Sequence, residues 1–178
     1  MQNVNQKTLK EGDEFKEFIL NRVKEMYLED GELLMPLVVL LQEDKKAHII
    51  AVPMNIPSKE MLYAYKKKVA STIKAKIKEL NAVRYLWIAE SWMSVRPIDN
   101  PQKDLAASDD PKAVTALIVS DETVHKCVTD IYFPNIIDVK TVELKHAPEH
   151  SMTHKKGDPL GTFQGLLYDP DSLEINQN

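Results

Sequence analysis

Cysteine is almost absent from this chain of 178 residues, which contains Cys127 alone. A single cysteine excludes an internal disulfide, and a chain that uses no disulfides suits a reducing compartment. Because Cys127 lies in an alternating, strand-like pattern, the sequence favours a small buried side chain over a reactive thiol.

Long hydrophobic runs are also missing. The longest, Leu33 to Leu41, is far shorter than the roughly 20 residues that a membrane-spanning helix needs. The first residues, MQNVNQKTLKEGDE, lack the apolar segment of a secretory signal. We therefore expect a soluble, cytoplasmic protein without a membrane partner. A chain of this length fits one α+β domain, expected over residues 14–146, with a polar tail over 1–13 and an acidic, Gly/Pro-containing arm over 147–178.

An excess of basic residues is missing as well, since 23 Lys and Arg stand against 27 Asp and Glu, a net charge of −4. Four acids and no basic residue follow Gly157, so the rest of the chain is neutral, which argues against a generally basic nucleic-acid binder. Residues 58–80 are locally basic, and one hypothesis places the acidic arm across them. Their seven lysines are Lys59, Lys66, Lys67, Lys68, Lys74, Lys76 and Lys78.

Two segments have the apolar spacing of three and four residues that is typical of amphipathic helices. The first covers Glu14 to Asp30, with Asp13 as its N-cap and Gly31 as its C-terminal stop. The second follows a break at residues 55–57 and is capped by Ser58. Its apolar stripe consists of Leu62, Tyr65, Val69, Ile73, Ile77 and Leu80.

The remaining pattern predicts strands. Residues 37–42 and 47–54 form a hairpin around the polar tetrapeptide 43–46, and the aromatic segment 83–96 predicts a central strand. A loop rich in Pro and Asp follows over 97–112. Then comes a meander, whose strands are expected over 113–120, 124–133 and 136–144, with turns at 121–123 and 134–135.

We summarise this order as helix, two strands, helix, three strands and an irregular arm. It predicts an α+β fold with a five-stranded antiparallel or mixed sheet, packed with two main helices. By element order alone, the chain resembles the profilin-like and roadblock-like folds. That resemblance implies a small scaffold for ligand sensing, scaffolding or dimerisation, and it carries over no site residue.

Glu90 is the least expected residue of the chain, because it lies in the middle of the aromatic strand. The period of two puts Ile88, Glu90 and Trp92 on one face and Trp87 on the other. A carboxylate at this position must be paired, protonated or open to a cleft, since an isolated buried charge is costly. It is either a general acid or base in an apolar cleft, or a structural group that pairs with Lys or Arg or turns outward at a bulge.

The histidines after residue 145 suggest a metal site. His146 to His150 matches H-x-x-E-H, a zinc-binding spacing, but Pro148 disfavours the helix that this motif requires. A looser site for a divalent metal such as zinc, built from His146, His150 and His154, remains open. The alternative is a solvated turn that binds no metal, and no other cofactor is predicted.

The aromatic strand and the lysine-rich helix are the candidate binding surfaces. Trp87 and Trp92 offer apolar contacts. An anionic partner would meet Lys66, Lys67, Lys74 and Lys78 on the polar side of the helix. Nucleic acid is not favoured, because the aromatics Tyr63 and Tyr65 stand at one end of that helix only.

Two classes of function therefore stay open. The favoured one is a non-catalytic regulator that binds a protein or a small ligand, as a homodimer, because no nucleophile, base and orienting group come together in the sequence. The alternative is a hydrolase-like enzyme with Glu90 as acid or base, aided by a metal or histidine from residues 146–154.

Overall fold

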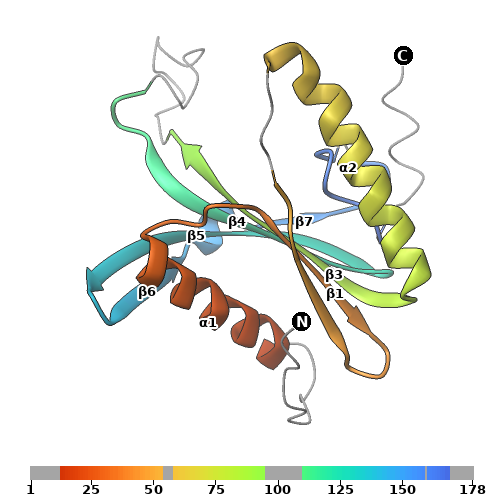
Figure 1. Ribbon diagram of the computed structural model, residues 1–178, viewed down its shortest axis with the longest axis horizontal. Coiled ribbons are helices and arrows are strands. Elements are labelled where there is room, and N and C mark those ends of the chain that lie inside the picture. The colour runs from red at the N-terminus through yellow and green to blue at the C-terminus, as the bar shows by residue number, and fades with distance from the viewer. Residues whose placement is uncertain (1–12, 54–57, 95–109, 159, 169–178) are drawn as a thin grey trace.

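The computed structural model describes residues 13–53, 58–94, 110–158 and 160–168. They form two helices, an antiparallel sheet and a short 3-10 helix, η2 (Figure 1). The helices are α1 (Asp13–Asp30) and α2 (Lys59–Glu79), and η2 is Pro148–His150. The strands are β1 (Leu37–Gln42), β2 (Ala47–Ala51), β3 (Ala82–Met93), β4 (Val114–Thr123), β5 (Lys126–Asp138), β6 (Thr141–His146) and β7 (Met152–His154). The loop predicted over 97–112 lies outside the described residues except for 110–112.

The sheet has the strand order β2-β1-β3-β4-β5-β6, and β7 also pairs with β5. Every pair is antiparallel, and β3 lies inside the sheet, between β1 and β4. The predicted α+β class is confirmed, but the prediction of five strands is wrong, because the sheet has seven strands in the described residues. The sequence analysis expects four strands after the second helix, over 83–96, 113–120, 124–133 and 136–144, but the summarised order counts only three. It also misses β7, three residues long, which forms by pairing with β5 and leaves no alternating pattern in the sequence.

Two predicted turns are strand in the structure. The turn expected at 134–135 lies inside β5, where Pro134 stands opposite Leu144 of β6. Proline is tolerated there because β4 pairs with β5 only as far as Tyr132, so one side of β5 needs no N–H donor beyond that point. Residues 121–123 end β4 instead of forming a turn, because all three pair with residues 126–128 of β5.

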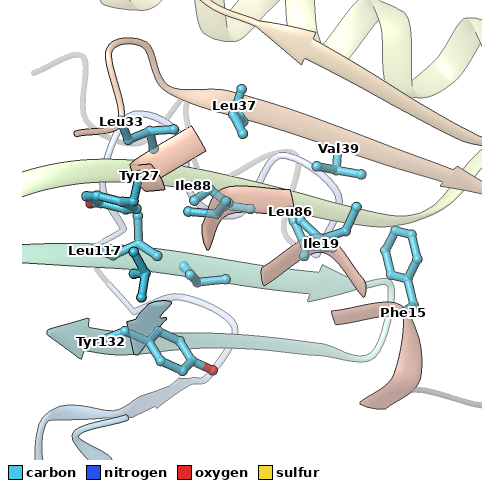
Figure 2. Packing of buried hydrophobic residues seen from close by; sticks show 13 residues of the cluster. Phe15, Ile19, Tyr27, Leu33, Leu37, Val39, Leu86, Ile88, Leu117 and Tyr132 are labelled. Carbon is cyan, nitrogen blue, oxygen red and sulfur yellow. The ribbon is translucent and has the colours of Figure 1, made fainter. Parts of the chain in front are cut away.

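The sheet buries apolar side chains on both faces, named here by the helix that covers each. On the α1 face, Ile19 and Tyr27 of the helix pack with Leu86 and Ile88 of β3 (Figure 2). On the α2 face, the alternate residues of β3, with Trp87 among them, pack against α2 and the segment 160–168. The two-residue alternation predicted for β3 is therefore confirmed for its core positions.

Local signals set the end of α1 and the start of α2 as predicted, whereas Asp13, expected as the N-cap of α1, is the first residue of that helix. α1 ends before Gly31, which has a φ of +80° and whose N–H donates to the carbonyl of Tyr27 at 3.0 Å. At the start of α2, the Ser58 hydroxyl accepts from the N–H of Met61 at 3.4 Å. The two helices lie on opposite sides of the sheet in Figure 1.

Helix α2 covers only part of its face. Its second half supplies the buried residues Ala70, Ile73 and Ile77, whereas Tyr65 in the first half is only half-buried. In Figure 1 the C-terminal end of α2 approaches β1 and β3, while its N-terminal end lies apart from the strands. The apolar surface that α2 leaves open must therefore be covered by something else or stay exposed.

The segment 160–168 covers part of that surface. Phe163 stacks on Trp87 with ring centroids 4.1 Å apart, and Leu166 is buried in the same cluster. The hydroxyl of Tyr85 donates to the carbonyl of Phe163 at 2.9 Å. The irregular segment predicted after β6 is therefore part of the core, even though its backbone forms no regular element here.

Glu122 attaches this segment to the sheet. Its side chain is fully buried, and its two carboxyl oxygens accept from the backbone N–H groups of Gly165 (2.6 Å), Leu167 (3.1 Å) and Tyr168 (3.4 Å). Burial raises the pKa of Glu122, and the three N–H donors offset only part of that rise. The carboxyl supplies acceptors that an irregular backbone cannot find in a sheet.

The raised pKa of Glu122 makes a prediction about stability. Between the ordinary carboxyl pKa, about 4.3, and the raised folded value, the folded state holds a proton that the unfolded state has lost. The contribution of the Glu122 carboxyl to the unfolding free energy is therefore present at low pH and is lost as pH rises through its pKa in the folded state. We expect the unfolding free energy of the parent, measured with urea, to fall relative to Glu122→Gln as pH rises from 4 to 8. Parallel pH profiles for the two proteins would contradict this.

Candidate functional site

Glu90 lies on the α1 face, half-buried, where it holds the connection between α1 and β1. One carboxyl oxygen, Oε2, accepts from the Tyr27 hydroxyl at 2.6 Å and from the backbone N–H of Leu33 at 3.1 Å. Neither donor is a lysine or arginine, so the ion pair expected for a structural Glu90 is replaced by neutral donors. Burial, followed by the hydrogen bond to Glu90, raises the pKa of Tyr27, so the phenol stays protonated and keeps donating.

The two tryptophans of β3 lie in different surroundings. Trp87 is buried on the α2 face, where its indole stacks on Phe163. Trp92 is 58% exposed. Of these two tryptophans, the structure therefore leaves only Trp92 available as an apolar contact on the surface.

The three histidines of the predicted metal site have separate partners. His146 Nε2 lies 3.2 Å from Asp130 Oδ1 and 3.1 Å from the Ser151 hydroxyl. His154 Nε2 lies 2.9 Å from the Thr129 hydroxyl. His150, in η2, faces the ring of Phe133 edge-on. Within the described ranges, no three His, Cys, Asp or Glu side chains are grouped so that they could hold a metal ion.

The structure shows a charged network on the α1 face that the sequence analysis did not predict. Arg84 binds Asp121 through two hydrogen bonds of 2.8 and 2.6 Å, and Lys16 of α1 donates to Asp130 and lies 4.0 Å from Asp121. Burial alone would raise the pKa of Asp130, but the hydrogen bonds from Lys16, Ser151 and His146 and the charge of Lys16 together outweigh it, so the pKa is lowered. His146 completes the chain of contacts. Because every charge in this network has an opposite partner, we interpret it as a clamp between α1 and the sheet.

A groove lies between α2 and the β1–β2 hairpin, with a volume of about 490 Å³. Apolar side chains of both strands form its floor, and α2 forms one wall. The lining consists of Val38, Leu40, Ile50, Ala51, Val52, Pro53, Tyr65, Lys68, Val69, Thr72, Ile73 and Lys76. This groove is the part of the α2 face that neither α2 nor the segment 160–168 fills.

The lysines of α2 divide into two groups. Lys68 and Lys76 line the groove, whereas the predicted binding residues do not appear in its lining: Lys66, Lys67, Lys74 and Lys78. Lys67 lies over the ring of Tyr63, 4.7 Å from its centroid. The lysines of α2 that line the groove are therefore not the ones that the sequence analysis singled out for binding.

Some sequence hypotheses fall on residues that the structure does not describe. Of the four acids that follow Gly157, only Asp158 is described, and its carboxylate accepts from the N–H of Lys155 at 2.7 Å. The hypothesis that the arm crosses the lysines stays a hypothesis. Neither helix in the described ranges is long and apolar enough to span a bilayer.

Comparisons with protein families, with curated protein sequences and with solved structures each find no significant match.

The geometry of Glu90 leads to a prediction about stability. Hydrogen bonds to a charged acceptor contribute about 1.5–3 kcal/mol, so Tyr27→Phe and Glu90→Gln are each expected to lower the unfolding free energy by about 1–2 kcal/mol. In urea unfolding the double variant should lose less than the sum of the two single losses, because both remove one shared contact. Glu143→Gln, on an exposed strand position, is the control and should change stability little. Strict additivity would contradict the role assigned to this pair.

Proposed function

We propose that this protein is a non-catalytic module that binds a small ligand in the groove between α2 and the β1–β2 hairpin. The observation that carries the proposal is the cavity of about 490 Å³ with a mainly apolar lining. Ligand sites of proteins are usually concave, apolar and about 300–1,000 Å³ in volume, with a few polar groups that orient the ligand. The groove has this size, and its polar groups are few.

The enzyme alternative receives less support. Glu90 does not line the groove, and its Oε2 already accepts hydrogen bonds from Tyr27 and Leu33. The thiol of Cys127 is buried, and burial, with the nearby Glu122, raises its pKa to about 12, so it is a poor nucleophile. The buried free thiol also supports the proposal of a cytoplasmic protein.

A second candidate is interaction with another protein, as a homodimer. It is favoured by large apolar side chains that the described structure leaves on the surface, of which Trp92 is 58% and Val139 88% exposed. Aromatic residues are enriched in the cores of protein interfaces. We expect light scattering after gel filtration to give the mass of a dimer for the parent and a larger monomer fraction for Trp92→Ser. A parent that stays monomeric at high concentration would remove this candidate.

The groove proposal predicts that an uncharged fluorescent dye such as Nile red binds the protein with saturation. Thr72 is exposed and lines the groove, so Thr72→Trp should fill the space without disturbing the core. We expect this variant to weaken dye binding about tenfold, a loss of about 1.4 kcal/mol.

Ser71→Trp is the matched control, because position 71 is an exposed neighbour on the same helix and does not line the groove. The control should bind the dye like the parent. If both tryptophan variants bind the dye as the parent does, the dye is held elsewhere and the proposed site is wrong.

A further inference from the structure

We infer that the ligand of this groove is an amphipathic anion, with an aliphatic chain on the apolar floor and a carboxylate head group beside Lys68 and Lys76. This inference rests on the proposed binding function and names the chemistry of its ligand. It follows from the hydrogen bonds that tie α2 to the hairpin region, from the apolar lining of the groove and from the positions of its lysines.

Hydrogen bonds tie α2 to the hairpin region near both ends of the helix. Near the start of the helix, the Tyr65 hydroxyl donates to the carbonyl of Pro53. At its end, the Gln42 amide donates to the carbonyl of Leu80 at 2.7 Å, and His48 in turn contacts Gln42 at 2.9 Å. Between residues 65 and 80 the helix runs about 22 Å. The helix is thus tied at two points, and the gap between them is a feature of the fold.

The floor between these ties is apolar. Val38 and Leu40 of β1 point to the α2 face, and Ile50 of β2, opposite Val38, lies beside them. Val69 and Ile73 of α2 form the facing wall. A polar head group placed on this floor would lose its hydration without gaining partners, whereas each buried methylene of an aliphatic chain is favourable.

The charged side chains that line the groove all have one sign. Lys68, Thr72 and Lys76 are four residues apart, so they lie along one stripe of α2. Among the described residues that line the groove there is no Asp or Glu. Lys76 pairs with Glu79 at 2.6 Å on the exposed side, and Lys68 makes no ion pair with any described residue. Lysine stems can lie along apolar surface while the ammonium stays in water, which suits an anionic head group at the rim.

Calorimetric titration with decanoate and decyltrimethylammonium, each below its micelle concentration, and with decanol below its solubility limit, tests the inference. We expect decanoate to bind with one site per chain, about two- to fivefold more tightly than decanol, as a partly exposed ion pair allows. The cation should bind more weakly than either. Shortening the chain to octanoate should weaken binding about fourfold for each methylene removed. Added salt should reduce the preference for decanoate over decanol, because it screens the ion pair.

Variants locate the head group. In Lys68→Gln/Lys76→Gln, the ratio of the decanol to the decanoate dissociation constant should fall to about one, since the apolar floor is kept and the charges are lost. Lys78→Gln, an exposed lysine of α2 outside the lining, is the control and should keep the parent's ratio.

The outcomes separate this inference from the proposed function. Equal affinity for decanoate and decanol, or preference for the cation, would overturn the inference and leave the binding groove intact. Binding to vesicles that contain an anionic phospholipid, without binding of free decanoate, would also overturn it and point to a membrane surface. Failure of all three probes and of Nile red to bind would overturn the proposed function as well.

Discussion

The structure depends on one constraint, namely that a single sheet exposes two apolar faces and only two helices are present in the described residues to cover them. The α1 face is closed by α1, with Phe15, Ile19, Val23 and Tyr27 in one buried row. The α2 face is wider than the part of α2 that reaches it. The segment 160–168 covers a second part of this face, and the groove is the part that remains.

Two glutamates, one on each face of the sheet, accept hydrogen bonds from backbone N–H groups of the segments packed there. Irregular backbone packed against a sheet has N–H groups without strand partners, and leaving them unsatisfied inside the protein would be costly. Glu122 accepts three such N–H groups from the segment 160–168, and Glu90 accepts one from Leu33 together with the hydroxyl of Tyr27. A carboxyl group in a strand is therefore interpreted here as an attachment point for a connecting segment. This accounts for Glu90 without requiring catalysis.

The sequence allowed prediction of the features that local interactions determine. Gly31 ends α1, Ser58 caps α2, and the tetrapeptide 43–46 joins β1 to β2, each through contacts within a few residues. The two misplaced turns failed for the opposite reason. Residues 121–123 are polar and therefore suggest a turn. However, the Glu122 carboxyl accepts a hydrogen bond from the backbone N–H of Gly165, more than 40 residues later, and no local sequence pattern can show this.

In the candidate site, too, long-range packing determines what the sequence could not predict. The lysine-rich helix was predicted, but the tilt of α2 decides that Lys68 and Lys76 line a cavity, and tilt follows from packing that the sequence alone does not specify. Glu90 was singled out because its position in an aromatic strand is unusual, yet its partner Tyr27 lies 63 residues away on another element. The separation of His146, His150 and His154 likewise follows from the route of β6, η2 and β7 along β5.

The most direct test of the central claim, that the α2 face holds an open binding groove, is a methyl NMR titration of the intact protein with decanoate. Strand β1 contains its own control, because Val38 and Leu40 line the groove while Leu37 and Val39 point to the α1 face. The account predicts saturable shifts for the methyl groups of Val38, Leu40, Val69 and Ile73, with those of Leu37 and Val39 nearly unmoved. Shifts of equal size on both faces of β1, or none on the groove side, would contradict it.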